Sequence, residues 1–287
     1  MIDVLIVGGG PAGISAAVYL QRFKYKVTVI AKDHGALGQS THIENYYGFE
    51  NPISGQELIE TGMKQAIRLG VDVHQNEEVL SILGSDPFIV KTNKAEYTSK
   101  VVLLATGLNR PNLRVKGFQA LSGKGISFCG ICDGFLYRKK RLGLIGAGDF
   151  MAEELDVLKN FTQDLTIFTN GEPLKVDSEG FQVVTEPILE FLGSDLLTGL
   201  KTAKATYDLD GVFIAAGTPS ASDFAVRIGA FVTPKNEIEV DKNFATNVLG
   251  LYAAGDCVGG LLQIAKAVSD GAQVALSINK YLKSKTS

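Results

Sequence analysis

The chain has 287 residues, 45% hydrophobic and 21% charged, which is enough for a large core and for two domains. The formal net charge of −3 excludes a general attraction to nucleic acid, and no run of about 20 apolar residues suggests a membrane span. The first strand is expected near Ile2, leaving no room for a signal peptide, so a cytoplasmic protein is expected. Three cysteines are too few for a disulfide scaffold or a four-cysteine metal site, and no metal is expected.

A glycine-rich turn follows the first expected strand. Residues 3–7 are apolar, and Gly8, Gly10 and Gly13 follow at G-x-G-x-x-G spacing before a helical stretch and a second apolar run at 27–30. In such a turn the first glycine permits the bend, the second admits a pyrophosphate, and the third lets helix and strand pack closely. The helix N-terminus adds amides that favour phosphate. The complete strand–turn–helix–strand context predicts a dinucleotide site rather than a structural glycine turn.

The end of the second strand lacks the acidic residue that usually binds a ribose in this type of site. Ala31 and Lys32 stand there, and Asp33 follows slightly late. Which residue would bind the ribose of a dinucleotide at this first glycine turn is therefore left open.

The segment CGICDG places Cys129 and Cys132 at C-x-x-C spacing. So short a loop lets two sulfurs close a disulfide reversibly and lowers the pKa of one thiol. Zinc would need two more ligands, and neither Cys257 nor the three histidines offer a matching spacing. A structural disulfide is unusual in the cytoplasm. We therefore expect redox-active use of the pair, with Cys257 as a small buried filler.

A second glycine turn, LIGAGDFMAEE at 144–154, departs from the pattern of the first. Gly146 and Gly148 keep the first two positions, but Met151 stands where Gly or Ala would allow close contact between helix and strand. Phe150 adds bulk beside the phosphate position. The second turn is therefore predicted to keep its geometry for folding and not for a ligand.

Three further apolar runs end in small-residue turns. They are VVLLATG at 101–107, GVFIAAG at 211–217 and NVLGLYAAGDCVGG at 247–260, the last of which ends near Asp256 and is followed by a helical stretch.

With these motifs, the chain resembles the flavoprotein disulfide reductases that have two dinucleotide-binding domains, and most of all the low-molecular-weight thioredoxin reductases. GGGPAGISAA, GQSTHIENYYG, LLATG, CGICDG, GAGDFMAEE and LYAAGD occur in that family's order and span nearly the whole chain. The resemblance implies an α/β fold of two Rossmann-like three-layer domains, bound FAD and a homodimer. It implies a discontinuous FAD-binding domain at 1–111 and 218–287, and a smaller inserted redox-disulfide domain at 112–217 with a degenerate NADPH-type nucleotide fold.

The resemblance also assigns cofactor contacts. Asp256 would bond the FAD backbone, and Gln263 and Ile264 would lie along the flavin. Gln39 and Asn45 would face the isoalloxazine. The full expected FAD set comprises residues of the first turn and of the strand ends: Gly8, Gly10, Pro11, Ala12, Gly13, Ala31, Lys32, Gly38, Gln39, Asn45, Val79, Ala105, Thr106, Gly107, Gly255, Asp256, Gln263 and Ile264.

The same resemblance gives roles to the redox segment. Cys132 would receive electrons from the flavin, and Cys129 would attack the disulfide of thioredoxin. Asp133 would move the proton that dithiol chemistry requires, although an aspartate that only forms the turn before Gly134 is the alternative.

The electron donor is where the chain departs from the NADPH-dependent members. They usually carry His-Arg-Arg for the 2′-phosphate, where this chain has Thr169, Asn170 and Gly171. Losing two arginine contacts weakens binding by about 3–6 kcal/mol, or roughly 10²- to 10⁴-fold, and NADH would still meet Met151. The pattern resembles the ferredoxin-dependent flavin thioredoxin reductases, which lack NADPH motifs. Ferredoxin is therefore the expected donor, since a flavin accepts single electrons and passes on a pair.

Two other functions stay open: an NADPH-independent dithiol oxidase that uses oxygen, and a thioredoxin reductase that still uses NAD(P)H. The intact cysteine pair argues against a third function, that of a flavin-binding regulatory protein without turnover. The basic segment RKKR at 138–141 would suit an acidic ferredoxin, with a solvated turn as the simpler alternative. Neither nucleic acid nor a membrane is an expected partner.

Overall fold

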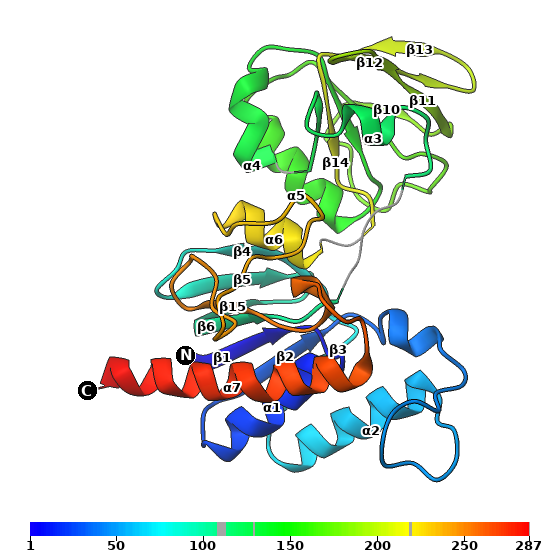
Figure 1. Cartoon of the computed structure of the whole chain (residues 1–287). Coiled ribbons are helices and arrows are strands. Elements are labelled where there is room, and N and C mark those ends of the chain that lie inside the picture. The colour runs from blue at the N-terminus through cyan, green and yellow to red at the C-terminus, as the bar shows by residue number, and fades with distance from the viewer. Residues whose placement is uncertain (108–112, 129, 218–219, 287) are drawn as a thin grey trace. The chain divides into compact units, whose positions relative to one another are not determined.

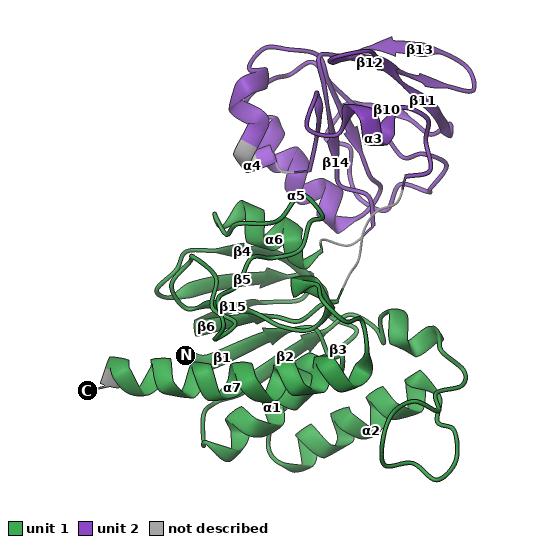
Figure 2. Cartoon of the chain, in the orientation of Figure 1, with its two compact units in different colours: residues 1–109, 220–287 green, residues 110–219 purple. Residues whose placement is uncertain are grey.

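The computed structural model describes residues 1–107, 113–128, 130–217 and 220–286. The chain forms two compact units, Met1–Asn109 with Ser220–Ser287 as unit 1 and Arg110–Pro219 as unit 2 (Figure 2). Of the boundary residues expected from the sequence, 111, 112 and 218 lie outside the described residues.

Unit 1 is built on a seven-stranded sheet in the order β3-β2-β1-β6-β5-β4, with β15 also paired to β6. The strands β1, β2, β3, β6 and β15 run parallel, whereas β4, β5 and β6 pair antiparallel. The strand bounds are β1 Ile2–Val7, β2 Val27–Ala31, β3 Asp72–Gln75, β4 Val79–Leu83, β5 Phe88–Thr92, β6 Glu96–Leu104 and β15 Leu251–Ala253.

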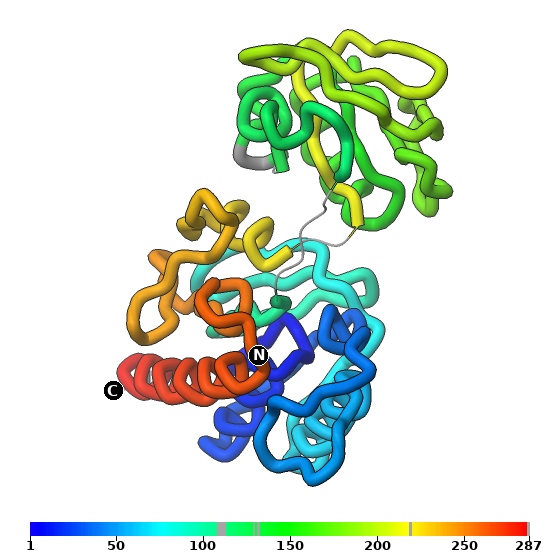
Figure 3. Tube along the Cα trace, turned by 45° about the vertical axis from the view of Figure 1, so that its right-hand side comes forward, coloured from blue at the N-terminus to red at the C-terminus, as the bar shows by residue number. Residues whose placement is uncertain are grey.

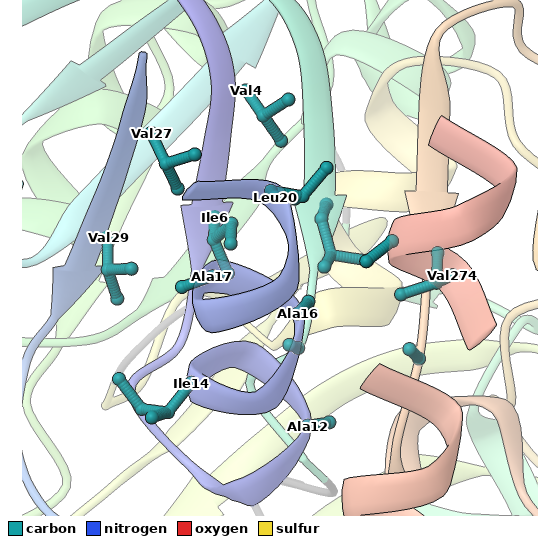
Figure 4. Close-up of a cluster of buried hydrophobic side chains, with 14 of the residues drawn as sticks. Val4, Ile6, Ala12, Ile14, Ala16, Ala17, Leu20, Val27, Val29 and Val274 are labelled. Atoms are coloured by element: carbon teal, nitrogen blue, oxygen red, sulfur yellow. The ribbon is translucent and has the colours of Figure 1, made fainter. Parts of the chain in front are cut away.

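Helices α1 (Pro11–Arg22), α2 (Gly55–Arg68) and α7 (Ile264–Thr286) cover one face of this sheet (Figure 1). Their apolar side chains pack on those of β1 and β2, as Figure 4 shows for Val4, Ile6, Ala17 and Val274. Every residue of β2 is buried, as expected for a parallel strand covered on both faces. The helices therefore hold the strand ends of unit 1 in fixed positions.

Helix α7 lies directly against α1 in both views of the chain (Figures 1 and 3). Gly271 permits this approach, because a Cβ there would lie 2.2 Å from the carbonyl oxygen of Ala12. The other face of the sheet packs on α6 (Ala221–Arg227), with Phe88 and Phe224 in one buried cluster. Unit 1 thus has three layers, and the short helices η1 (Ala36–Gln39) and η3 (Asp256–Val258) complete it.

Unit 2 repeats the plan on a smaller scale. Among its described residues, a five-stranded sheet has the order β10-β9-β8-β14-β7, and a three-stranded antiparallel sheet has the order β11-β12-β13. The strand bounds are β7 Ile126–Ser127, β8 Leu142–Ile145, β9 Leu165–Phe168, β10 Gln182–Val184, β11 Ile188–Gly193, β12 Leu197–Thr202, β13 Thr206–Asp208 and β14 Gly211–Ile214. The helices are α3 Phe118–Leu121, α4 Gly130–Asp133, η2 Gly134–Tyr137 and α5 Asp149–Leu158.

The central strands of the two units have matching neighbours. In unit 1, β1 lies between β2 and β6, and the N–H of Ala105 donates to the carbonyl of Val7 at 2.8 Å. In unit 2, β8 lies between β9 and β14, and the N–H of Ala215 donates to the carbonyl of Ile145 at 2.7 Å. The predicted α/β fold with two Rossmann-like domains is confirmed. Across the described ranges, no helix combines the length and apolar character needed to cross a membrane.

Candidate functional site

The residues expected to bind FAD lie in unit 1, where most of them follow the carboxyl ends of its parallel strands. This edge is where open parallel sheets bind ligands. After β1 come Gly8, Gly10, Pro11, Ala12 and Gly13; β2 ends at Ala31 before Lys32; Ala105, Thr106 and Gly107 follow β6; Gly255 and Asp256 follow β15. Gly38 and Gln39 belong to η1, Val79 begins β4, Ile264 begins α7 directly after Gln263, and Asn45 lies in the loop between η1 and α2.

The first glycine turn combines tight packing with one open position. Gly8 has a φ of +115°, and a Cβ there would lie 2.3 Å from the carbonyl oxygen of Ala105. A Cβ at Gly13 would lie 2.0 Å from the carbonyl oxygen of Gly8. At Gly10, by contrast, a Cβ would meet nothing within 4 Å. Gly8 and Gly13 are therefore required by the protein's own packing, whereas Gly10 leaves room for a ligand.

Two more observations fit a phosphate-containing cofactor at this turn. Helix α1 begins at Pro11 with no side-chain cap at Gly10, so its first amides are available to an anion. The hydroxyl of Thr106 is buried and has no hydrogen-bond partner among the described residues. The residues of this edge therefore fit a bound dinucleotide.

At the predicted flavin position, two side chains distant in sequence meet. The Nδ2 of Asn45 donates to the Oε1 of Gln263 at 2.9 Å, across a separation of 218 residues. The η1 segment is fixed nearby by the N–H of Gly55, which donates to the carbonyl of Ser40 at 2.8 Å. The structure thus brings together two residues that the family resemblance assigns to the flavin ring.

The end of β2 has a charged pair that the sequence did not reveal. The Nζ of Lys32 lies 3.2 Å from Oε2 of Glu78. The N–H of Glu77 donates to the carbonyl of Ala31, which fixes this segment beside the strand end before β4 begins at Val79. A carboxylate therefore does lie beside the end of β2, supplied from a later strand connection that local sequence reasoning could not associate with it.

The turn that carries Asp256 is held by two residues that sequence reasoning missed, Lys266 and Asp270 of α7. The Nζ of Lys266 donates to the carbonyls of Gly255 and Gly259 and lies 2.7 Å from Oδ2 of Asp270. Burial raises the pKa of the Asp256 carboxyl, while the Lys266 ammonium opposes the shift and Asp270 adds to it. The only local signal was their spacing of four, which also suits a solvated helix pair.

The expected catalytic segment belongs to unit 2. Cys129 lies outside the described residues, and Cys132 is described only as part of helix α4. Asp133 ends this helix, and its Oδ2 accepts a hydrogen bond from the hydroxyl of Ser127 at 2.6 Å. The third cysteine, Cys257, is a buried free thiol of unit 1 whose pKa is raised to about 12 by burial, which fits its expected role as filler.

A buried acid lies beside the cysteine helix. Glu154 of α5 is only 1% exposed, and its Oε2 accepts the backbone N–H of Gly130 at 2.7 Å. A Cβ at Gly130 would lie 2.9 Å from that oxygen. The sequence signal was a glutamate within an otherwise apolar helical face, and the contact fixes α4 against α5.

The second glycine turn keeps its backbone plan but differs in its side chains. Helix α5 begins at Asp149 with Gly148 as an uncapped N-terminus, and a Cβ at Gly148 would meet nothing within 4 Å. Met151 is fully buried and Phe150 nearly so, in one cluster with other side chains of the unit. A Cβ at the equivalent Gly13 would clash with its own turn, whereas the second turn accommodates the buried side chain of Met151.

The segment after β9 folds back over this second turn. The N–H of Lys175 donates to the carbonyl of Ala147 at 2.8 Å, and Leu174 and Val176 pack against the cluster that contains Met151. The side chain of Asn170, expected near the ribose position, accepts the N–H of Ile188 at 2.7 Å.

The basic segment after the cysteine helix is partly engaged within unit 2. Two nitrogens of the Arg141 guanidinium donate to the carboxylate of Asp210, both at 3.2 Å, and this hydrogen bond raises the pKa of Arg141. Arg138, Lys139 and Lys140 are exposed. Arg141 is exposed as well, so all four residues of RKKR reach solvent, and Arg138 and Lys140 lie over the rings of Phe161 and Tyr137.

Comparison with known proteins identifies the family. The model described as pyridine nucleotide-disulphide oxidoreductase matches residues 2–271. The chain belongs to this family. Its members bind FAD, so the expected cofactor is confirmed, and the chain is a flavin-dependent disulfide oxidoreductase of the thioredoxin reductase type. Within the described part of the chain, no group of three or more His, Cys, Asp or Glu could hold a metal ion.

The relatives agree with this assignment. Thioredoxin reductase of Aquifex aeolicus strain VF5 is 30% identical over 304 residues, covering 99% of this chain and 94% of its own. The atypical thioredoxin reductase TRi of Desulfovibrio vulgaris Hildenborough has a TM-score of 0.91 and 34% identity, with 99% of each chain covered. A ferredoxin-flavin thioredoxin reductase of Clostridium acetobutylicum has a TM-score of 0.71 and 27% identity, covering 99% of this chain and 98% of its own.

Proposed function

We propose that this protein passes electrons from reduced ferredoxin through FAD and the Cys129–Cys132 dithiol to thioredoxin, without NADPH. Relatives of the chain are thioredoxin reductases, and one of the similar structures is a ferredoxin-flavin thioredoxin reductase. The expected FAD residues listed for unit 1 serve as its cofactor site. The homodimer and the cytoplasmic location stay predictions.

The observation that carries the donor assignment is the covered second glycine turn. In a working dinucleotide site the adenosine half lies between the glycine turn and the end of the next strand. Here the segment after β9 bonds to the turn beside that place, since the N–H of Lys175 donates to the carbonyl of Ala147 and the Asn170 side chain accepts the N–H of Ile188, while the space at Gly148 itself stays open. Asp149 adds an acidic side chain to the first turn of α5, where an anion would need positive surroundings. Together these features disfavour NADPH and NADH alike.

The chain's residues would divide the chemistry as follows. FAD, when bound, supplies the conversion of single electrons into the pair that a disulfide needs. The amides at the start of α1 would hold its pyrophosphate, and Asp256 and Gln263 would orient it. Reduction of a disulfide takes up two electrons and two protons, and we assign the movement of a proton at the dithiol to Asp133, whose carboxylate accepts a hydrogen bond from the Ser127 hydroxyl.

The surface after α4 supports a protein substrate. Phe135 and Leu136 lie in η2, just beyond the cysteine helix, and are 56% and 55% exposed; Arg138 and Lys140 lie shortly after them in the chain. An exposed apolar pair with basic neighbours suits a partner with an apolar and acidic surface. We assign this surface to thioredoxin, and the ferredoxin contact expected for the basic segment at 138–141 is not part of this proposal.

An anaerobic titration of the FAD-loaded protein tests the donor. Reduced ferredoxin should bleach the flavin absorbance and then reduce added thioredoxin, whereas NADPH and NADH should leave the flavin oxidised. Rapid bleaching by NADPH would refute the proposal in favour of a conventional reductase.

The rival dithiol oxidase shares the covered turn and is separated by its acceptor. Oxygen consumption with peroxide release on addition of a small dithiol would favour it, and slow reoxidation of the reduced flavin in air would count against it.

For both candidate functions, Cys132→Ser should retain bound FAD and lose disulfide reduction. Unchanged turnover in that variant would remove the assigned role of the cysteine pair.

A further inference from the structure

The FAD-side turn after β15 is built almost entirely from glycines and short side chains. Gly255, Gly259 and Gly260 all have positive φ, at +86°, +76° and +79°. Glycines have large backbone freedom in the unfolded and locally opened chain, and η3 is too short to restrain them. The turn that carries Asp256 therefore needs contacts from outside to keep one shape.

Lys266 supplies those contacts from the first turn of α7. Its ammonium has three N–H donors, and the structure gives it three acceptors: the carbonyl of Gly255 at 2.9 Å, the carbonyl of Gly259 at 2.7 Å and Oδ2 of Asp270 at 2.7 Å. The two carbonyls lie at opposite ends of η3, so a single side chain closes the turn. The side chain is 21% exposed, which shields these bonds from competing water.

Asp270 completes the arrangement from one helical turn farther along α7. Its side chain is 7% exposed, and the same Oδ2 that meets Lys266 also accepts the N–H of Gly255 at 3.1 Å. Gly255 is thus held at both its N–H and its carbonyl. A buried ion pair is retained at such a place for position rather than for net stability, because desolvation offsets most of its attraction.

We propose that Lys266 and Asp270 are positioning residues for FAD: they hold the turn that presents Asp256, and their two charges set the electrostatic potential at the start of α7. That helix begins at Ile264, where the cofactor's flavin is expected. The inference rests on the FAD site of the family and is independent of the electron donor.

The charges of Lys266 and Asp270 should shift the midpoint potential of the bound FAD in opposite directions. A purely structural role predicts no such pair of opposite shifts. Reduction adds negative charge to a flavin, so a nearby ammonium favours the reduced state and a nearby carboxylate disfavours it. Removing Lys266 should lower the midpoint potential of the bound FAD. Removing the charge of Asp270 should raise it.

Three variants separate position from charge. Asp270→Asn keeps an oxygen for Gly255 and Lys266, so it should retain FAD affinity within about threefold of the wild type and shift the potential upward. Lys266→Met loses two turn contacts and should weaken FAD binding about 10- to 100-fold, with the potential shifted downward. The double variant Lys266→Met with Asp270→Asn should bind FAD weakly at a potential near that of the wild type. Lys280→Met, an exposed lysine of the same helix, is the matched control and should change neither quantity.

The measurements are FAD dissociation, followed by the fluorescence of released FAD, and the potential, from equilibration with reference dyes. Thermal unfolding of each apoprotein checks the fold. Potential shifts of the same sign in the two single variants, or unchanged FAD affinity in Lys266→Met, would overturn the inference. Neither result would bear on ferredoxin, because the anaerobic titration with ferredoxin, NADPH and NADH tests the donor separately.

Discussion

At the scale of single residues, Gly13 and Met151 occupy the same place in two related turns with opposite results. A Cβ at Gly13 would lie 2.0 Å from the carbonyl of Gly8, whereas Met151 is fully buried among the side chains of α5, β8 and β9. A glycine in the first turn permits close contact for a ligand site, and a methionine in the second fills a core.

Glu154 is a residue whose replacement tests the anchoring of α4. Glu154→Leu leaves the buried N–H of Gly130 without its acceptor and should lower the free energy of unfolding by about 1–3 kcal/mol. Glu154→Gln keeps an oxygen at that position and should lose less. Denaturant unfolding of both variants is the measurement, and a leucine variant as stable as the glutamine variant would contradict the contact.

Asp223, in the capping box at the start of α6, should make stability depend on pH. Burial raises the pKa of its carboxyl above the ordinary value of 3.8, although hydrogen bonds from Ser220 oppose the shift. A raised pKa in the folded state means that stability present at low pH is lost as the pH rises through the raised value, by at most about 1.4 kcal/mol per pH unit. Asp223→Asn should remove this part of the slope. Unfolding free energies from pH 4 upward test it, and equal slopes in both proteins would exclude Asp223 as the cause.

Sequence reasoning succeeded where the signal was local. The spacing of Gly8, Gly10 and Gly13 predicted the first turn, and the resemblance brought Asn45 and Gln263 to one place, where they are hydrogen-bonded. It missed the contacts that depend on packing between distant segments. Glu154 stands on an apolar helical face, which indicates burial but not its partner Gly130, and the spacing of Lys266 and Asp270 suits an exposed helix pair as well as a turn clamp. The RKKR segment was interpreted as a contact for an acidic ferredoxin or as a solvated turn, and neither interpretation included the pairing of Arg141 with Asp210.

At the scale of elements, the segment after β9 replaces a ligand with protein. Leu174 and Val176 pack on the cluster of α5, and Lys175 bonds to the turn before that helix. The sequence showed only the missing basic residues there. It could not show that the chain returns across the turn, because that path is set by apolar contacts with β8 and α5.

Met151→Ala tests whether this element serves packing. The methionine is fully buried, so the variant should lose about 2–5 kcal/mol of unfolding free energy in unit 2. NADPH should still fail to bleach the flavin, because the segment after β9 stays across the turn. Calorimetry and flavin absorbance measure the two outcomes. An unchanged stability with new NADPH-dependent bleaching would show that Met151 blocks a working site.

At the scale of the whole molecule, the two units share one architecture, and the proposed function gives a bound nucleotide to unit 1 alone. Gly10 and Gly148 are the matched positions, each the uncapped N-terminus of its helix in extended backbone, with open space around a built Cβ. A Cβ at either position has no protein atom within 4 Å. A difference between the two valine variants in cofactor binding or turnover therefore reports a ligand at one of the turns.

Gly10→Val should therefore weaken FAD binding at least about tenfold, since it fills the space left for the pyrophosphate. Gly148→Val should stay yellow and reduce thioredoxin with ferredoxin at the wild-type rate. The flavin content of the purified proteins and the rate of thioredoxin reduction are the measurements. A Gly148→Val protein that keeps FAD and loses turnover would reveal a ligand at the second turn.

The chain that covers its own second turn has a consequence for cell physiology. A reductase with an open nicotinamide site equilibrates its dithiol with the balance of NADPH and NADP⁺, and so with sugar catabolism and biosynthetic demand. On the proposed function, in which the second turn beside the Lys175–Ala147 bond takes no nicotinamide nucleotide, that balance would have no direct route to the dithiol. Its thiol output would instead rise and fall with the supply of low-potential electrons from the reactions that charge ferredoxin.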